Sequence, residues 1–300
     1  MEVNHFLPKS PNLELFKDIE NLLNSRVDGS IYKKYENSKH FLRRHEERLE
    51  LPDITLITAH GQKNAIIELS HEGEKPLKLI SIDDSSKFNR NFIFSFSCET
   101  AHGLGPAMIE SGALTYIGFY SKFSPNFKFN GIPGEKFNDS IALLGKKIFA
   151  YAFSIVFSDF INNPCTANEF YNNLMIYIHI LLSKVEGFDL EKLIRTFGVP
   201  IRKPYFEQHK ALIFVTLHSI FDKAYSDINI LGEENYIPWF NLSRLNKSKL
   251  EEILSSYKMK DERNQYYSTF VKCKVASLLN DDVVKDKNYK LLEKSLQECI

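Results

Sequence analysis

One histidine and one cysteine in this sequence directly follow apolar, strand-like runs, and together these two residue types can carry out nucleophilic chemistry. His60 follows the run at 53–59, and Cys98 follows the run at 92–97. In an open α/β sheet, ligands bind beyond the carboxyl ends of the strands. If the two runs are parallel neighbours, an imidazole and a thiol project from the same edge, where the imidazole can activate the thiol.

Two neighbouring residues extend this candidate site. Gly61 follows the histidine, and because glycine has no Cβ, a substrate carbonyl can approach its backbone closely. Glu99 follows the cysteine, and Asp83 and Asp84 lie near another predicted strand end. These carboxylates either line a pocket for a basic side chain or are solvated loop acids, and the sequence leaves both interpretations open.

The sequence lacks the residue spacing of a metal site or a disulfide framework. A zinc-peptidase interpretation of His45-Glu46 requires a second histidine four residues after the first, but position 49 is Leu. The cysteines are far apart and form no CxxC or Cys/His cluster: Cys98, Cys165, Cys273 and Cys299. We therefore expect no metal and no cofactor.

Short apolar runs predict the strands that would position the site. They are bounded by turn residues and lie at 53–59, 65–70, 77–82, 92–97 and 113–119. Residues 103–112, which lie between glycines, predict a short crossover helix. Strands of this kind, separated by a helix, predict an α/β fold with a mostly parallel sheet flanked by helices.

Helical periodicity dominates on both sides of these strands. The first 50 residues predict helices, and Thr166 with Glu169 forms a capping box that opens a later helix. The helices predicted in the second half lie at 137–161, 166–185, 189–197, 245–257, 261–280 and 286–298, while 210–221 suits either a helix or a strand. We divide the chain into an N-terminal helical segment at 1–50, an α/β domain at 51–235 and a C-terminal helical appendage at 236–300.

Composition narrows the class of protein. Thirty-eight basic and 38 acidic residues give a net charge of zero, which argues against a protein that mainly binds nucleic acid through its phosphates. The 24 phenylalanines are expected to fill the core. The N-terminus lacks a signal-peptide pattern, and the apolar run at 174–182 has about half the length of a membrane span. We expect a cytoplasmic protein that contacts neither a membrane nor nucleic acid.

The segment around the cysteine resembles a known peptidase family. SFSCETAHGLG followed by IESGALTYIGF is similar to the CHAT branch of the caspase-like (clan CD) cysteine peptidases. That family has a strand, a Ser-Ala-Cys-Glu-Thr-Gly type turn, a short helix and a strand that opens with Gly-Ala, and its histidine ends an earlier strand and is commonly followed by glycine. The matching residues here are Ser97, Cys98, Glu99, Thr100, Gly112 and Ala113, with His60-Gly61 ahead of them.

This resemblance covers about residues 53–160 and implies a fold, an activity and roles. The fold would be a caspase-like, mostly parallel sheet, with the peptidase domain at 51–235 and a large helical C-terminal part. The activity would be that of a cysteine endopeptidase acting on a protein or peptide. Cys98 would attack the scissile carbonyl and His60 would protonate the leaving amine, while the N–H groups of Gly61 and Cys98 would hold the oxyanion.

Regulation by a partner is also expected. The resemblance implies a bacterial effector of antiviral defence or programmed death that stays inactive until a partner protein engages it. The loop at 120–136 is placed to form a substrate wall and to be ordered by that partner. Two alternatives remain: a catalytically silent caspase-like scaffold or partner-binding module, and an unrelated α/β binding domain with an incidental cysteine.

Overall fold

A six-stranded sheet forms the centre of the computed structural model, which describes residues 2–9, 13–26, 31–46, 53–68, 75–121 and 135–297. The strands, in spatial order, are β2 (Tyr32–Tyr35), β1 (Val3–Phe6), β3 (Ile54–Thr58), β7 (Phe92–Phe96), β8 (Thr115–Phe119) and β9 (Ile228–Gly232). Each pairs in parallel with its neighbour except β9, which is antiparallel to β8. The predicted α/β fold with a mostly parallel sheet is therefore confirmed.

The N-terminal segment at 1–50 contains strands, and the prediction that it is helical throughout is wrong. β1 and β2 enclose α1 (Glu14–Arg26), and α2 (Ser38–Glu46) follows β2. β1 lies between β2 and β3, so this segment completes one side of the sheet. Each strand has only four residues, VNHF and YKKY, a length at which periodicity carries little signal and pairing with neighbours decides the structure.

A second, smaller sheet follows β3. It is antiparallel and consists of β4 (His60–Gln62), β5 (Ala65–Glu68) and β6 (Leu77–Ser81). The predicted strands at 65–70 and 77–82 are therefore present, but they lie outside the main sheet. β4 was not predicted, because three residues are too few to show an alternation. A 3₁₀ helix, η2 (Ile82–Phe88), then leads toward β7.

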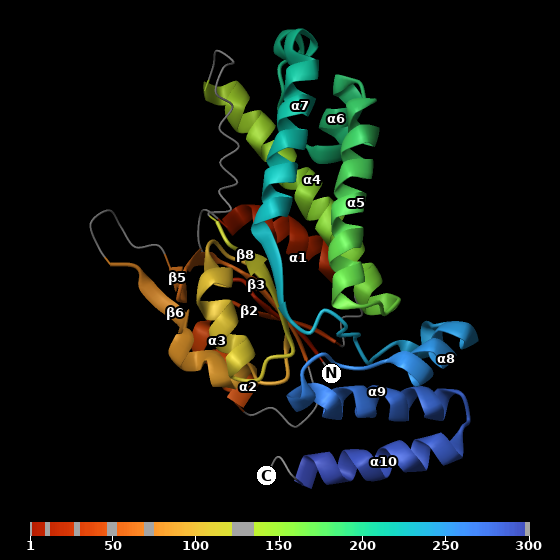
Figure 1. Cartoon of the computed structure of the whole chain (residues 1–300). Helices are drawn as coiled ribbons and strands as arrows, with labels where there is room; N and C mark the ends of the chain where they lie inside the picture. Colours follow the sequence, from red (N-terminus) through yellow and green to blue (C-terminus); the bar gives the residue numbers. More distant parts are fainter. Residues whose placement is uncertain are drawn as a thin grey trace.

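Helices cover both faces of the main sheet (Figure 1). On one face, α2, η2 and α3 (Leu104–Glu110) pack over residues such as Ile57, Ile93 and Tyr116. On the other face, α1 and α4 (Glu135–Asn162) pack over Ile54 and Leu56. Neighbouring residues of one strand thus enter different cores, which is why the predicted runs are continuously apolar.

Phenylalanine rings fill the core between β7 and the helices, as the sequence predicted. Phe94 and Phe96 both point toward α4, where the Phe153 ring lies 5.0 Å and 4.6 Å from theirs. Phe92 lies 5.0 Å from the ring of Phe160 on the same helix. All five side chains are buried, so this aromatic layer anchors the strand that leads to Cys98.

A helical arm extends from the sheet between β8 and β9 (Figure 1). It consists of α4, α5 (Ala167–Glu186), α6 (Leu190–Phe197) and α7 (Lys203–Asp227). The capping box of α5 is confirmed, because the Glu169 amide donates to Thr166 Oγ1 at 3.1 Å and the Thr166 amide donates to Glu169 Oε2 at 2.7 Å. The undecided run at 210–221 is helical and lies within α7.

The C-terminal part is helical, as predicted. Its helices are α8 (Lys247–Ser256), α9 (Gln265–Leu278) and α10 (Asp282–Gln297); a short 3₁₀ turn at Leu242–Arg244 precedes α8, and another at Glu262–Asn264 lies between α8 and α9. The buried Tyr267 of α9 stacks on Tyr236, whose ring in turn stacks on Phe92 of β7. This part therefore shares one hydrophobic core with the sheet.

Residues 138–162 of α4 are the one stretch, within the part of the chain that the structure describes, that is long and apolar enough to suit a membrane span. Their most apolar window has a mean hydropathy of 1.6, and 61% of it is buried inside the protein. A helix buried to this extent is typical of the core of a soluble protein. The apolar run at 174–182 belongs to α5.

Candidate functional site

The two strands that lead to His60 and Cys98 are parallel neighbours. β3 pairs with β7 from Ile54 opposite Phe92 to Thr58 opposite Phe96. Beyond the last pair, the Ala59 amide donates to the Phe96 carbonyl oxygen at 3.3 Å. The two strands pair without a shift in register and end together at Thr58 and Phe96. His60 and Cys98 each lie two residues beyond these ends, at the same carboxyl edge of the sheet.

Gly61 packs directly on the backbone of the cysteine. A Cβ atom built on Gly61 would lie 2.6 Å from the Cys98 carbonyl oxygen and 2.8 Å from the Cys98 amide nitrogen. It would also lie 2.8 Å from Cβ of Ser97. Only glycine fits such an approach, and the backbone that approaches Gly61 belongs to Cys98. The approach of a substrate carbonyl to Gly61 stays a prediction.

The environments of the imidazole and the thiol suit acid–base chemistry. His60 is half-buried in β4, and this burial lowers its pKa below the ordinary value of 6.5. The imidazole is therefore largely neutral near pH 7, and the neutral imidazole is the form that can accept a proton. Cys98 is partly exposed at the same edge of the sheet.

A tight turn follows the cysteine. Glu99 has a φ of 59°, in the left-handed region that non-glycine residues seldom occupy. The turn is held by the Thr100 hydroxyl, which donates to the Ser97 carbonyl oxygen at 2.9 Å, and by the Glu99 amide, which donates to the Ser121 carbonyl oxygen at 3.1 Å. Glu99 is the residue after Cys98, and its side chain is partly exposed at the same edge of the sheet.

The residues that support this turn follow β8 and precede β9, and they were not predicted from the sequence. Ser121 donates its hydroxyl proton to Asp227 Oδ2 at 2.5 Å, and the Tyr120 amide donates to the Asp227 carbonyl oxygen at 2.8 Å. Asn229 donates to the Tyr120 hydroxyl at 2.5 Å. The signal available was the apolar run at 228–232, which forms β9 and brings Asp227 to the carboxyl edge.

Asp84 serves a structural role. Its Oδ2 accepts the Ser81 amide at 2.9 Å at the start of η2, and its Oδ1 pairs with Lys87 at 2.9 Å. The exposed Asp83 lies in the same first turn. These contacts favour the interpretation of both residues as loop acids rather than as the lining of a substrate pocket.

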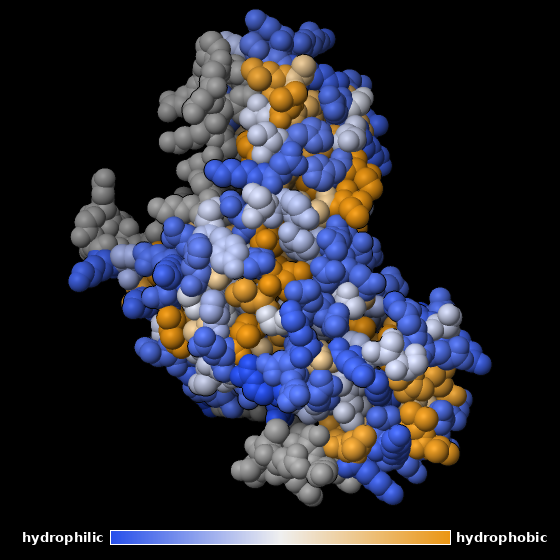
Figure 2. All heavy atoms as spheres, in the orientation of Figure 1, coloured by the Kyte–Doolittle hydropathy of each residue, from blue (hydrophilic) through white to orange (hydrophobic). Residues whose placement is uncertain are grey.

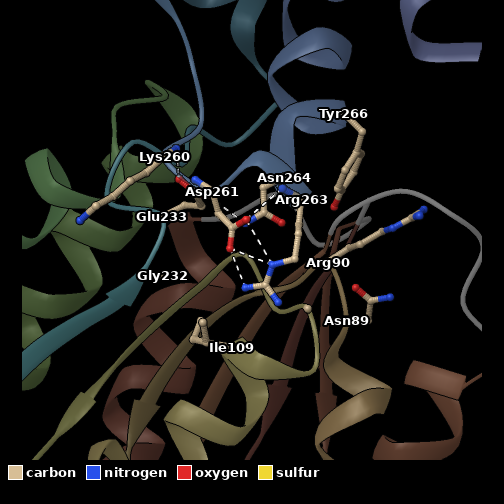
Figure 3. Close-up of a pocket in the computed structure, with 11 residues that line it drawn as sticks. Asn89, Arg90, Ile109, Gly232, Glu233, Lys260, Asp261, Arg263, Asn264 and Tyr266 are labelled. Atoms are coloured by element: carbon tan, nitrogen blue, oxygen red, sulfur yellow. Dashed lines mark hydrogen bonds and ion pairs between the residues drawn. The ribbon is translucent and has the colours of Figure 1, made fainter. Parts of the chain in front are cut away.

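A pocket lies at the opposite, amino edge of the parallel strands (Figure 3). It has a volume of about 540 Å³ and lies between the sheet and the start of α9. Its residues are Asn89, Arg90, Ile109, Gly112, Gly232, Glu233, Lys260, Asp261, Arg263, Asn264 and Tyr266. None of the residues predicted for the site lines it.

Two further findings concern ligands and predicted residues. Among the described residues, no group of three or more His, Cys, Asp or Glu side chains could hold a metal ion. The predicted loop at 120–136 falls largely at 122–134, which lies outside the described residues, as does Cys299.

No protein-family model matches the chain, and no curated protein matches it.

Proposed function

We propose that this protein is a cysteine endopeptidase of the CHAT, caspase-like type, with Cys98 as nucleophile and His60 as acid–base. The observation that carries the proposal is the contact between Gly61 and the Cys98 backbone, which brings the histidine's own strand against the cysteine at one sheet edge.

The reaction begins when His60 accepts the Cys98 thiol proton and the sulfur attacks the scissile carbonyl carbon. The N–H groups of Gly61 and Cys98 stabilise the oxyanion that forms, and His60 then gives its proton to the leaving amine. The C–N bond breaks and a thioester remains. Water, deprotonated by the same imidazole, attacks this thioester and releases the acid product and the thiol.

The sheet supports the resemblance to the family. A caspase-like sheet has strands before the histidine strand, and β1 and β2 stand in that position. The segment after Cys98 also has the expected elements, because η3 (Thr100–His102) and α3 precede β8, which follows Gly112-Ala113. Glu99, next to the nucleophile, is the proposed contact for a substrate side chain.

The proposed regulation is by a partner protein that engages the helical arm. Apolar side chains interrupt the polar surface of this arm (Figure 2), among them Ile176 and Ile180 of α5 and Val215 of α7, which are 57%, 58% and 67% exposed. The arm joins β8 and β9 beside the site, so a partner there is well placed to influence catalysis in a cytoplasmic effector.

The decisive experiment compares wild type with Cys98→Ala and His60→Ala on a library of fluorogenic peptides. We expect each variant to lose hydrolysis by at least about a hundredfold, because the first lacks the nucleophile and the second lacks the proton acceptor. Both side chains follow strands at the sheet edge, so the folds should survive, as thermal unfolding can verify.

Labelling by peptidyl acyloxymethyl ketones provides the matched control. Mass spectrometry should find the adduct on Cys98 in the wild type and little adduct in His60→Ala, while Cys165→Ser and Cys273→Ser retain full labelling. Hydrolysis that persists in folded Cys98→Ala contradicts the proposal. A silent scaffold would instead show neither hydrolysis nor preferential labelling of Cys98.

A further inference from the structure

The turn after Cys98 has a backbone conformation that needs external support. Glu99 occupies the left-handed region at φ 59° without being glycine. Such residues keep their conformation only where the surrounding structure fixes them. The support on the far side of the turn is the Ser121 carbonyl oxygen, which accepts the Glu99 amide at 3.1 Å.

Ser121 is in turn fixed by Asp227. The Ser121 hydroxyl donates to Asp227 Oδ2 at 2.5 Å, and the adjacent Tyr120 amide donates to the Asp227 carbonyl oxygen at 2.8 Å. The second bond extends the β8–β9 ladder one residue past the pair of Phe119 with Ile228. Asp227 thus binds both residues that follow β8: its backbone carbonyl accepts the Tyr120 amide, and its carboxylate accepts the Ser121 hydroxyl.

The place of Asp227 in its own helix indicates that it is not there for helix stability. It is the last residue of α7, where the helix dipole disfavours a negative charge. α7 leads directly into β9 beside the site (Figure 1). The hydrogen bond with Ser121 is therefore the stabilising contact that accounts for an acidic residue at this end of the helix.

We propose that Asp227 is a positioning residue for Cys98, acting through Ser121 and Glu99. The effect of Asp227 on catalysis rests on the proposed function, because the turn that Asp227 supports carries the proposed nucleophile. It also makes the end of α7 the point where the helical arm is coupled to the site.

The test uses Asp227→Ala, which removes the acceptor, and Asp227→Asn, whose amide oxygen can still accept the Ser121 hydroxyl. Iodoacetamide alkylation is followed by mass spectrometry at Cys98 and, in the same sample, at the half-buried Cys273 of α9. We expect Asp227→Ala to change the alkylation rate of Cys98 about tenfold and to leave Cys273 unchanged, while Asp227→Asn stays near wild type. Hydrogen exchange of the Glu99 amide should accelerate in the same variant.

Ser121→Ala provides a second variant that removes the same hydrogen bond from the other side, should Asp227→Ala fold poorly. The double variant should be no worse than either single one, because both break a single bond. With a peptide substrate, kcat should fall by about 10- to 100-fold with little change in KM.

Two results would overturn the inference. One is an unchanged Cys98 rate and Glu99 exchange in folded Asp227→Ala and Ser121→Ala. The other is a parallel rise at Cys98 and Cys273, which would show general loosening of the fold. If the wild type hydrolyses no peptide, the proposed function fails, but alkylation and exchange still decide whether Asp227 positions the turn.

Discussion

Gly61 directly follows His60 and packs against the backbone of Cys98. Its Cα approaches the Cys98 backbone so closely that any side chain would collide with main-chain atoms, which cannot rotate away as a flexible side chain would. The backbone of the His60-Gly61 segment is therefore fixed against the backbone of Cys98.

Gly61→Ala should accordingly lower peptide hydrolysis by about 10- to 100-fold and destabilise the fold by about 1–3 kcal/mol, because the backbone must shift to admit the methyl group. Hydrolysis rates and urea unfolding measure the two effects. Gly187→Ala is the matched control, since its Cβ would meet only the Lys184 carbonyl oxygen at 3.4 Å and its φ is −72°. Equal effects of the two substitutions would refute this account.

His5 is a second histidine whose environment has a measurable consequence. It is fully buried in β1, with Nδ1 2.5 Å from the Tyr32 hydroxyl and Nε2 2.6 Å from Thr58 Oγ1. Burial lowers its pKa to about 3. The native protein therefore keeps this imidazole neutral at pH values where the unfolded chain, with a pKa of about 6.5, takes up a proton.

The stability that the neutral, buried His5 contributes should be fully present above about pH 6.5. It should fall as the pH drops from about 6.5 toward 3. Between pH 7.5 and pH 5 this residue accounts for about 2 kcal/mol of lost stability. His5→Gln does not titrate, so its urea midpoint should depend less steeply on pH than that of wild type, although its stability at pH 7.5 is lower. A His5→Gln slope equal to that of wild type would contradict the prediction.

At the scale of elements, one buried carboxylate joins the C-terminal helices to the sheet. Glu233 directly follows β9 and is 1% exposed. Its oxygens accept the Lys260 amide at 2.6 Å, the Asp261 amide at 2.8 Å and the Asn264 side chain at 2.9 Å, as Figure 3 illustrates. The connection from α8 to α9 is therefore fixed to the end of β9.

Glu233→Gln should destabilise the protein by about 1–3 kcal/mol, because an NH₂ group replaces one of the two accepting oxygens and then faces a backbone N–H donor that has lost its acceptor. Urea unfolding followed by tryptophan fluorescence measures this. Exposed Glu234→Gln should change stability by less than about 0.5 kcal/mol. If the two variants unfold at the same urea concentration, Glu233 does not anchor the helices.

At the scale of the whole molecule, the helical arm is an insertion between two paired strands. β8 and β9 are antiparallel neighbours, yet α4 to α7 separate them in the chain. Both ends of the insertion therefore lie at the carboxyl edge, where Cys98 also lies. Because the insertion leaves and rejoins the sheet at this one edge, four helices are inserted without interrupting the pairing of β8 with β9.

The sequence by itself determined the central strands, the long helices and the pair of His60 and Cys98. These features depend on local information: apolar runs, helical periodicity, the capping box at Thr166 and the residues that directly follow strands. Only the tertiary structure decided that β1, β2 and β9 join the sheet, that Gly61 packs on Cys98, and that Asp227 supports the turn through Ser121. Strands of four or five residues carry little periodic signal, and contacts between residues more than 100 positions apart, such as Ser121 with Asp227, arise only when the chain is folded.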